Sequence, residues 1–362
     1  MNPPHPSPPP AWDPGLFRAS VATTLAGFVD EQGERLTDLG EDAARLVEAA
    51  RRALSGGKRL RAAFCYWGFR SVLDQGYDEQ HLVRAAAALE VLHASALVHD
   101  DYMDASDVRR GHPAAHRAFE RQHREAGWGG DPEQYGAAAA ILLGDLLLSW
   151  ADELLRTCGF DHARVLDALG YLDTTRTEVI TGQFLDVSVQ ARRASDVDAA
   201  MKVLRYKSAK YSVERPLHIG AALAGAGADV LESLSGFGLP LGEAFQLRDD
   251  LLGVFGDPDV TGKPAGDDLV EGKRTVLVAL ALEHASPMDA RHLDERLGTP
   301  LDDDDIAALR GIIAASGAHA RVETMIEELT ARCLDVLDRA PVTETARDVL
   351  RDLAAAATQR AG

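Results

Sequence analysis

The sequence has few cysteines and no segment typical of export or membrane insertion. Its three cysteines, Cys65, Cys158 and Cys333, lie far apart and form no CxxC pair, which excludes a disulfide framework and a cysteine-rich metal site. The N-terminus lacks the basic region and long apolar core of a signal peptide. The most apolar stretch, residues 137–143, stops at Gly144 and is too short to cross a bilayer. We expect a protein of the reducing cytoplasm that does not insert into a membrane.

Positive charge is also scarce. The chain carries 38 Lys and Arg against 57 Asp and Glu, so its formal net charge is −19. Nucleic acids and anionic membrane surfaces would repel such a protein, and we expect neither as a partner. If the protein nevertheless binds phosphate groups, it must gather cationic side chains locally or use metal ions to offset its own charge.

Proline is missing from two long stretches, residues 15–111 and 133–215, in which alanine and leucine dominate and alternating β-branched residues are rare. Apolar residues recur there at three- and four-residue spacing, which predicts long helices. One such series is Leu82, Ala85, Ala86, Leu89, Leu92 and Ala96. Glycine and proline predict helix breaks at residues 56–57, 111–113, 127–132, 225–227, 236–240 and 256–266.

The predicted fold is therefore all-α, with a single large antiparallel helical bundle. We expect one domain from residue 15 to residue 362, because 46% of the chain is hydrophobic and no linker interrupts it. Residues 1–14 are rich in proline and serine, and we expect them to form a disordered tail.

The first chemically distinctive motif is His99-Asp100-Asp101-Tyr102-Met103-Asp104, at the end of a predicted apolar helix. In a helix, Asp100 and Asp104 are one turn apart and project from the same face. Their charges repel each other unless a cation lies between them. Carboxylate oxygens suit Mg²⁺, which takes waters and phosphate oxygens as its remaining ligands. A single DDxxD motif would still be interpreted as a solvated helix end.

A second acidic pair changes that interpretation. Asp249 and Asp250 end another predicted apolar helix, and Gly253 takes the place of a third aspartate one turn later. Gln246 lies one turn before Asp249 and can reach the same cleft. Two such helix ends, facing each other across a bundle, could hold a diphosphate through shared Mg²⁺ ions. The predicted metal-binding residues are Asp100, Asp101, Asp104, Asp249 and Asp250.

Basic residues lie next to glycines. Lys58 and Arg61 are one turn apart after the pair Gly56–Gly57, in a motif that lacks the first glycine and the Ser or Thr of a Walker loop. Arg109 and Arg110 follow the first acidic motif and could contact two different phosphate groups. Any one of these residues alone would be interpreted as a surface residue.

Three lysines, Lys207, Lys263 and Lys273, lie in short motifs in the second half of the chain, and Ser208 follows the first of them. His93 lies seven residues before the first aspartate motif and shares its helix face. A buried core histidine is an equally good interpretation of His93 by itself.

Taken in order, the motifs resemble those of the all-trans polyprenyl diphosphate synthases, the short-chain isoprenyl diphosphate synthase family. The motifs are GGKRxR, DDxxD followed by RRG, KSA, and FQxxDDxxGxxGD, and the resemblance runs from about residue 54 to residue 275. It implies the isoprenoid synthase type I fold around a central cavity, and homodimerisation. The implied activity is Mg²⁺-dependent condensation of isopentenyl diphosphate with an allylic diphosphate (dimethylallyl, geranyl or farnesyl), which releases pyrophosphate. Ser208 stands where threonine is usual, and Ala62 where proline is usual.

The resemblance also implies a role for each motif residue. Asp100, Asp104 and Asp249 are expected to bind Mg²⁺ directly, three ions per active site, and Asp101 and Asp250 to support them through water or hydrogen bonds. The residues expected to hold the allylic diphosphate are Arg109, Lys207, Ser208, Gln246, Lys263 and Lys273. Those expected to hold isopentenyl diphosphate are Lys58, Arg61, His93 and Arg110.

Product length is expected to depend on the helix that carries Asp100. Ser95 and Ala96 lie about one turn before it, and farnesyl-producing relatives tend to have bulky residues there. Because both are small here, we expect geranylgeranyl diphosphate as the main product. The floor of the tail pocket would lie deeper, at Val91, Leu92 or the helix over residues 137–148. A farnesyl or longer product remains an alternative.

Three other classes were compared with this prediction. A helical di-iron carboxylate protein would use Glu90-x-x-His93 and Glu120-x-x-His123 as ligands, but the second element is expected on a solvated face, and both aspartate pairs would have no role. A class I terpene cyclase would carry an Asn/Ser/Glu motif in place of Asp249 and its neighbour and needs no isopentenyl site. A non-catalytic partner subunit should have lost its acidic motifs.

Overall fold

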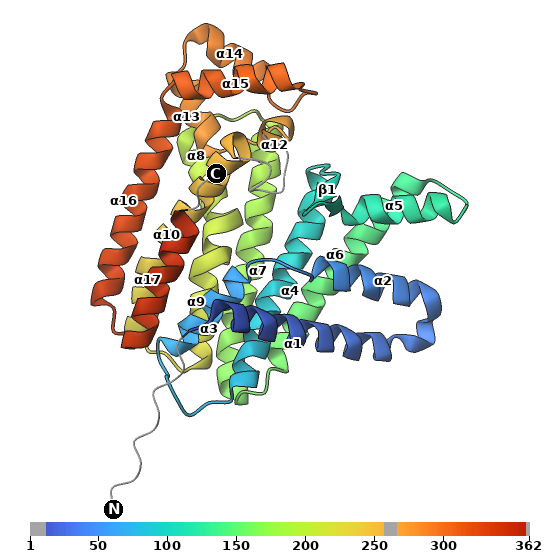
Figure 1. Ribbon diagram of the computed structural model, residues 1–362, viewed down its shortest axis with the longest axis vertical. Helices are drawn as coiled ribbons and strands as arrows, with labels where there is room; N and C mark the ends of the chain where they lie inside the picture. Colours follow the sequence, from blue (N-terminus) through green and yellow to red (C-terminus); the bar gives the residue numbers. More distant parts are fainter. Residues whose placement is uncertain (1–11, 257–265, 360–362) are drawn as a thin grey trace, which may run out of the picture.

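The structure, a computed structural model, describes residues 12–256 and 266–359 and confirms the all-α fold. Long helices run up and down through the molecule (Figure 1). Within the described ranges, the only strands are the two-residue β1 (Val108–Arg109) and β2 (His112–Pro113), which form a small antiparallel hairpin after the first acidic motif. The helices are α1 (Pro14–Arg35), η1 (Thr37–Leu39), α2 (Gly40–Ala53), α3 (Leu60–Arg70), α4 (Glu79–Met103), α5 (Ala115–Glu125), α6 (Pro132–Arg156), α7 (His162–Ala191), α8 (Val197–Val203), η2 (Leu204–Glu214), α9 (Arg215–Leu223), α10 (Ala228–Phe255), α12 (Asp267–Val270), α13 (Val276–His284), α14 (Pro287–Arg296), α15 (Asp303–Ala315), α16 (Ala318–Arg339) and α17 (Glu344–Thr358).

Several helices begin at an aspartate whose carboxylate accepts hydrogen bonds from backbone N–H groups of the first turn. These N–H groups have no partner within the helix, and a negative charge there also interacts well with the helix dipole. The capping residues are Asp13, Asp78, Asp131, Asp161, Asp196 and Asp302. Part of the acidic excess of the sequence therefore has a structural role.

Helix α1 begins earlier than predicted. Asp13 caps it, and the ring of Trp12 packs 5.0 Å from Phe17, 5.5 Å from Tyr66 and 5.1 Å from Trp67, measured between centroids. Residues 12–14, which were expected to belong to the tail, are therefore part of the fold, because burying aromatic surface outweighs the local proline signal. Residues 1–11 lie outside the described ranges.

Helix α4 lies in the core and carries the first acidic motif at its C-terminal end. It packs against α6, α3 and α1, and the four consecutive alanines at 85–88 are fully buried. In the described part of the chain, it is the one helix long and apolar enough to cross a membrane by length and composition alone. In that apolar window, 72% is buried inside the fold, as is common for a core helix.

Helix α10 continues through residues 236–240, where a break was predicted, so that prediction was wrong. Pro240 is buried inside the helix. The glycines near it permit close packing instead of a turn, since a Cβ on Gly242 would lie 2.4 Å from the carbonyl oxygen of Ala209 in η2. Tertiary packing against η2, α16 and α9 thus overrides the local tendency of proline to end a helix.

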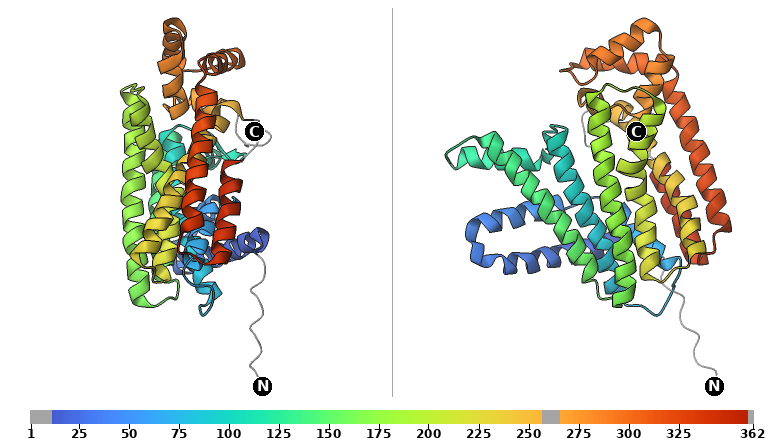
Figure 2. Two further views of the ribbon diagram at one scale, coloured as in Figure 1. Left: turned by 90° about the vertical axis from the view of Figure 1, so that its left-hand side faces the viewer. Right: turned by 180° about the vertical axis from the view of Figure 1, so that it is seen from behind.

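Two apolar clusters meet at α10. The larger one is formed mainly by α1–α7, α9 and α17, and the smaller one by α13–α16 with the C-terminal half of α10. Figure 1 shows α13, α14 and α15 stacked at one end of the molecule, and Figure 2 shows α7, α10 and α16 following one another as layers. Because α10 packs into both clusters, the position of its acidic pair relative to α4 is fixed.

Candidate active site

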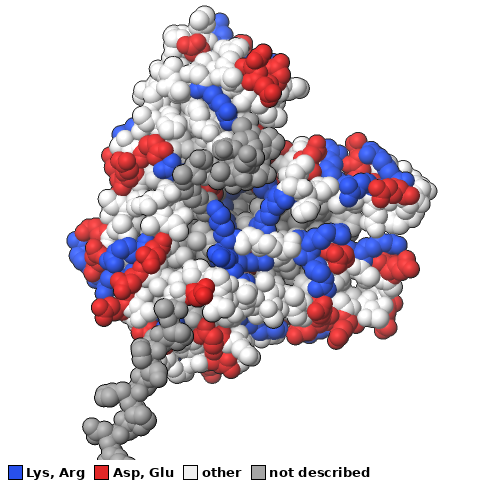
Figure 3. Space-filling view, in the orientation of Figure 1, with Lys and Arg blue, Asp and Glu red and all other residues white. Residues whose placement is uncertain are grey.

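A cavity of about 1180 Å³ lies where α4, η2 and α10 converge. Figure 3 shows Lys and Arg gathered around a hollow in the centre of one face, on a protein with a negative net charge. The local concentration of cations that the charge balance required is therefore present. Another part of the cavity wall is apolar and comes from α4, α6 and α7. Its residues are Ala96, Leu97, Ile141, Val179, Ile180, Phe184 and Val187.

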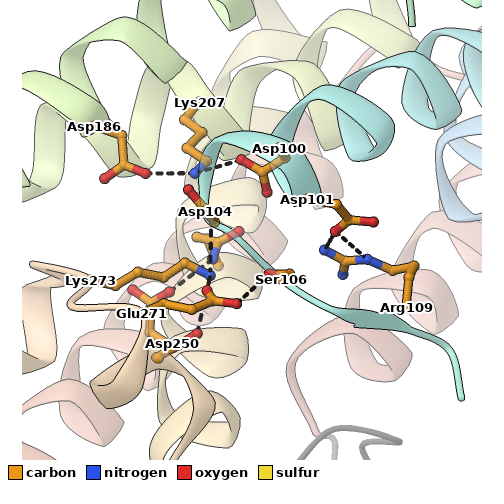
Figure 4. Close-up of polar contacts among 12 residues, drawn as sticks. Asp100, Asp101, Asp104, Ser106, Arg109, Asp186, Lys207, Asp250, Glu271 and Lys273 are labelled. Carbon is orange, nitrogen blue, oxygen red and sulfur yellow. Dashed lines mark hydrogen bonds and ion pairs between the residues drawn. The ribbon is translucent and has the colours of Figure 1, made fainter. Parts of the chain in front are cut away.

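The first acidic motif is at the C-terminal end of α4. Asp100 lines the cavity, and Asp104, the C-cap of the helix, lies close to it. Asp101 is buried and points away from Asp100 to form an ion pair with Arg109 (Figure 4). Asp100 therefore faces the cavity, whereas Asp101 is taken up by an arginine.

The second acidic motif reaches the same cavity from α10. Asp249, Asp250 and Gln246 all line it. The Gln246 side-chain amide donates to Asp250 Oδ1 at 2.8 Å. The two helix ends that the sequence placed 149 residues apart (249 − 100) therefore meet across one cavity.

Two partly buried lysines lie between the acidic helices. Lys207 Nζ is 3.2 Å from Asp100 Oδ1 and 2.6 Å from Asp186 Oδ2. Lys273 Nζ lies 3.8 Å from Asp104 Oδ2 (Figure 4). Both ammonium groups thus point at the first acidic motif from neighbouring elements, one from η2 and one from the segment after α12.

Three acidic residues of this cluster were missed from the sequence: Asp186, Asp268 and Glu271. Lys273 pairs with Asp268 at 3.3 Å and with Glu271 at 2.5 Å. Gly253 stands where the second acidic motif would have a third aspartate. A Cβ on Gly253 would lie 2.0 Å from Asp268 Oδ2, so the carboxylate of Asp268 occupies the space beside this glycine. Three acidic residues, Asp267, Asp268 and Glu271, precede Lys273 in the sequence. This cluster of charge could have indicated that Asp268 and Glu271 belong to the site.

The electrostatics of the cluster show an excess of negative charge. Burial, and then the neighbouring Asp100, raise the pKa of Asp104 to about 6. Burial, and then Asp268, raise the pKa of Asp250 to about 8. Although burial opposes their charge, the surrounding carboxylates raise the pKa values of Lys207 and Lys273. Two lysines therefore do not fully compensate this many carboxylates.

The cluster fits a divalent cation that brings other ligands with it. Asp100 Oδ1 is buried and has no well-aligned hydrogen bond within the described residues. In the same ranges, no group of three or more His, Cys, Asp or Glu side chains is close enough to hold a metal ion by itself. Mg²⁺ commonly binds through one or two carboxylates and completes its shell with waters and phosphate oxygens. The donor set is thus of the magnesium–phosphate type.

A basic wall lies at the start of α3. Lys58, Arg61, Arg110 and Arg109 line the cavity there. Arg59 has a left-handed backbone conformation, with φ of 55°, and its buried guanidinium forms an ion pair with Glu90 at 3.3 Å. Arg59 therefore anchors the loop whose neighbouring residues point cations into the cavity.

Three residues that were predicted to contact the diphosphates remain: Ser208, His93 and Lys263. Ser208 and His93 line the cavity. His93 Nδ1 is 2.5 Å from the hydroxyl of Tyr211, and Tyr211 is a further cavity residue that the sequence did not indicate. Lys263 lies outside the described residues.

The predicted chain-length residues are only partly on the cavity wall. Ala96 lines the cavity, but Ser95 faces α6, where its hydroxyl donates to the Gly144 carbonyl at 2.7 Å. Val91 and Leu92 are buried in the apolar core and do not line the cavity. The expectation that Ser95 borders the tail pocket was wrong, and neither Val91 nor Leu92 forms its floor. Neighbouring residues of a helix point about 100° apart, and only one face of α4 borders the cavity.

Helix α6 contributes little to the cavity floor. From the helix over residues 137–148, which was expected to set the floor, only Ile141 lines the cavity. The other apolar residues of this stretch either pack inside the bundle or, like Leu142, point outward.

The di-iron alternative does not fit the structure. Glu90 pairs with Arg59, and Glu120 pairs with Arg117 at 2.8 Å and with Arg124 at 2.6 Å. Glu120 and its partner His123 are buried, not solvated as expected from the sequence. Because arginines occupy the glutamates, and no suitable cluster exists within the described ranges, the two elements cannot form one iron site.

Comparison with known proteins gives a consistent result. The family described as Polyprenyl synthetase matches residues 43–313. A geranylfarnesyl diphosphate synthase of Aeropyrum pernix is 33% identical over 302 residues, which are 83% of this chain and 88% of that protein. A (2E,6E)-farnesyl diphosphate synthase of Mycobacterium tuberculosis is 31% identical over 302 residues, covering 82% of this chain and 78% of that protein.

The solved structures agree with the sequence matches. A geranylgeranyl pyrophosphate synthase from Corynebacterium glutamicum, determined with isoprenyl diphosphate and magnesium, superposes with a TM-score of 0.94 at 41% sequence identity. The match covers 97% of this chain and all of that chain. The fold is thus the all-helical isoprenoid synthase fold that the motifs implied. The chain belongs to the polyprenyl synthetase family and is a trans-prenyl diphosphate synthase.

Proposed function

We propose that this enzyme condenses isopentenyl diphosphate with an allylic diphosphate and makes geranylgeranyl diphosphate as its main product. The observation that carries the proposal is the meeting of two acidic helix ends around two partly buried lysines. Lys207 lies 3.2 Å from Asp100, and Lys273 lies 3.8 Å from Asp104. Such a cluster suits the diphosphate group of the allylic substrate, which leaves as pyrophosphate in this reaction.

The acidic residues would hold Mg²⁺. Asp100 and Asp104 from α4 and Asp249 from α10 would be direct ligands, shared among three ions. Asp250 would act through its hydrogen bond with Gln246, and Asp101 through its ion pair with Arg109. Mg²⁺ would supply Lewis acidity that stabilises charge on the departing pyrophosphate.

The two diphosphates would bind on different walls of the cavity. The allylic diphosphate would contact the cavity side chains near the two acidic motifs: Arg109, Lys207, Ser208, Gln246 and Lys273. Lys263, which lies outside the described residues, is assigned to the same group by its motif alone. The isopentenyl diphosphate would contact the basic wall beside α3: Lys58, Arg61, His93 and Arg110. Arg109 and Arg110 are adjacent and both line the cavity, which supports the division of one Arg-Arg motif between two anions.

The chemistry then follows from charge stabilisation. As the allylic C–O bond breaks, Lys207 and Lys273 offset the growing negative charge on the pyrophosphate. The double bond of isopentenyl diphosphate attacks the allylic cation, and a new C–C bond forms. The released pyrophosphate takes the proton that is then lost, so no protein base is needed. The apolar residues of α4, α6 and α7 keep water away from the cation.

Product length is the finer part of the proposal. Ala96 is small and is on the cavity wall, so the pocket is not closed one turn below Asp100. The likeness to a geranylgeranyl pyrophosphate synthase at 41% identity supports the same length. Relatives named geranylfarnesyl and farnesyl diphosphate synthases represent the alternatives.

We also propose a homodimer of the cytoplasm. The outer faces of α6 and α7 expose apolar side chains, and Phe184, 70% exposed, also lines the cavity. A second copy that covered this face would close the apolar wall and exclude water from the reaction. The other large exposed apolar residues of this face are Ile141, Leu142, Leu166, Ile180 and Val187. All three cysteines are buried and free, which supports a reducing compartment.

One assay tests the central proposal. Purified protein would be incubated with isopentenyl diphosphate and, in turn, dimethylallyl, geranyl or farnesyl diphosphate, with and without Mg²⁺, and the products sized after dephosphorylation. We expect Mg²⁺-dependent release of pyrophosphate and geranylgeranyl diphosphate as the main product. A different dominant length would overturn the product assignment, and no condensation with any allylic substrate would overturn the substrates.

A further inference from the structure

His93 and Arg61 are linked through one residue, Tyr211, which the predicted ligand set did not include. Tyr211 lies on η2, a π-helix, a rare form that is often found at functional sites. Its hydroxyl is 2.5 Å from His93 Nδ1. The guanidinium of Arg61 lies over its ring, 4.2 Å from the centroid, and Arg61 Nη2 donates to the Ser212 hydroxyl at 2.8 Å.

The surroundings of His93 keep its imidazole neutral. Burial, followed by Arg61, Arg110, Arg109 and Arg59, lowers the pKa of His93 well below its ordinary value. A neutral imidazole carries one N–H, either at Nδ1 or at Nε2, and the group bonded to one nitrogen decides which tautomer is present. The partner of Nδ1 therefore determines what Nε2 can do.

The partner of Nδ1 is the Tyr211 hydroxyl. Burial raises the pKa of Tyr211 to about 12, so the phenol keeps its proton and can donate it. Within the described residues, Nε2 of His93 has no hydrogen-bond partner, and the ring lines the cavity. An anionic diphosphate accepts hydrogen bonds only, so it can use His93 only if Nε2 carries the proton.

We propose that Tyr211 is a positioning residue for isopentenyl diphosphate. The Tyr211 hydroxyl donates to His93 Nδ1 and thereby holds the Nε2–H of the imidazole toward the diphosphate. The Tyr211 ring also supports the Arg61 guanidinium. The inference rests on the proposed function, because it assigns His93 and Arg61 to isopentenyl diphosphate. It adds a reason why a neutral histidine surrounded by arginines is useful there. A donor without charge binds the anion and adds nothing to the repulsion among the cations.

The tautomer is testable without enzyme turnover. In protein labelled with ¹⁵N-histidine, long-range ¹H–¹⁵N correlation spectra report which ring nitrogen carries the proton. The spectrum of His93→Gln identifies the His93 signals among the 12 histidines. We expect the Nε2–H tautomer in the wild-type protein. An Nδ1–H tautomer would overturn the proposal, whether or not the enzyme is active.

The kinetic test uses Tyr211→Phe, which keeps the ring under Arg61 and removes only the hydroxyl. We expect KM for isopentenyl diphosphate to rise about tenfold, the usual size for a lost hydrogen bond in an anion site, with KM for the allylic substrate within about twofold of wild type. In a His93→Gln background, Tyr211→Phe should not raise KM for isopentenyl diphosphate further, because that variant has no imidazole whose tautomer the Tyr211 hydroxyl could set.

A matched control is Tyr206→Phe on the same π-helical segment. Tyr206 does not line the cavity, so its KM values should stay at wild-type levels. Equal increases in both KM values for Tyr211→Phe, or an undiminished effect in the His93→Gln background, would show a merely structural role. If wild-type protein fails to use isopentenyl diphosphate at all, the function proposal fails, while the tautomer measurement still decides the Tyr211–His93 arrangement.

Discussion

Ala96 and Ser95 form an adjacent pair of small residues on α4 that should respond differently to the same substitution. Ala96 lines the cavity, whereas the Ser95 hydroxyl donates to the Gly144 carbonyl of α6 at 2.7 Å. Ala96→Phe should therefore place a ring across the apolar part of the cavity. Ser95→Phe should place the same ring into the packed contact between two helices.

The magnitudes follow from burial. A tail pocket that loses room for one five-carbon prenyl unit forfeits about 0.8 kcal/mol per carbon, or about 4 kcal/mol in all. This corresponds to roughly a thousandfold slower final elongation if the unit is fully excluded. Ala96→Phe should thus make a product at least one prenyl unit shorter, and Ala96→Leu a mixture. Stability should change by less than about 1 kcal/mol, because the site faces a cavity.

For Ser95→Phe, overpacking costs about 1–3 kcal/mol and the lost hydrogen bond about 0.5–1.5 kcal/mol. We therefore expect a loss of about 1.5–4.5 kcal/mol in the free energy of unfolding, measured with chemical denaturant, and the wild-type product length in the fraction that stays folded. Product sizing after dephosphorylation, together with the unfolding curves, separates the two effects. Shorter products from Ser95→Phe but not from Ala96→Phe would refute this placement of the tail.

Three further predictions concern other parts of the site. Asp100→Asn and Asp249→Asn should each lower turnover more than about a thousandfold while far-UV circular dichroism stays unchanged, and retained activity in either variant would remove its assigned role. Asp186→Asn, which removes the ion pair at 2.6 Å from Lys207, should lower kcat/KM for the allylic substrate about 10- to 100-fold with little change in KM for isopentenyl diphosphate. Leu142→Glu should shift the molar mass in light scattering from two chains to one, whereas the control Met288→Glu at an even more exposed position on α14 should not; an unchanged mass for Leu142→Glu would place the interface elsewhere.

The helical architecture and both acidic motifs were readable from local patterns. Helical periodicity depends on which residues recur every three or four positions, and a DDxxD spacing determines by itself that Asp100 and Asp104 share a helix face. Aspartate caps are similarly local, because each carboxylate bonds the N–H groups two or three residues later. These features need no information about what packs against the helix.

Other features were misread because a second element decides them. The predicted break at residues 236–240 is instead a continuous helix, since Gly242 lets η2 approach α10 closely. Helix α4 is buried on several sides, and the sequence spacing between Ser95 and Asp100 does not show which side borders the cavity. Ser95 in fact faces α6. Glu120 was expected on a solvated face and is buried between paired arginines.

The sequence by itself therefore determined the fold class, the two carboxylate-bearing helix ends and most of the cations, because each is encoded within one or two helical turns. The tertiary structure alone decided which partners meet. It brought Asp186 to Lys207, Asp268 to the space beside Gly253, and the Tyr211 hydroxyl to His93. These pairs come from different helices, and their contacts depend on how the helices pack, which no local pattern records.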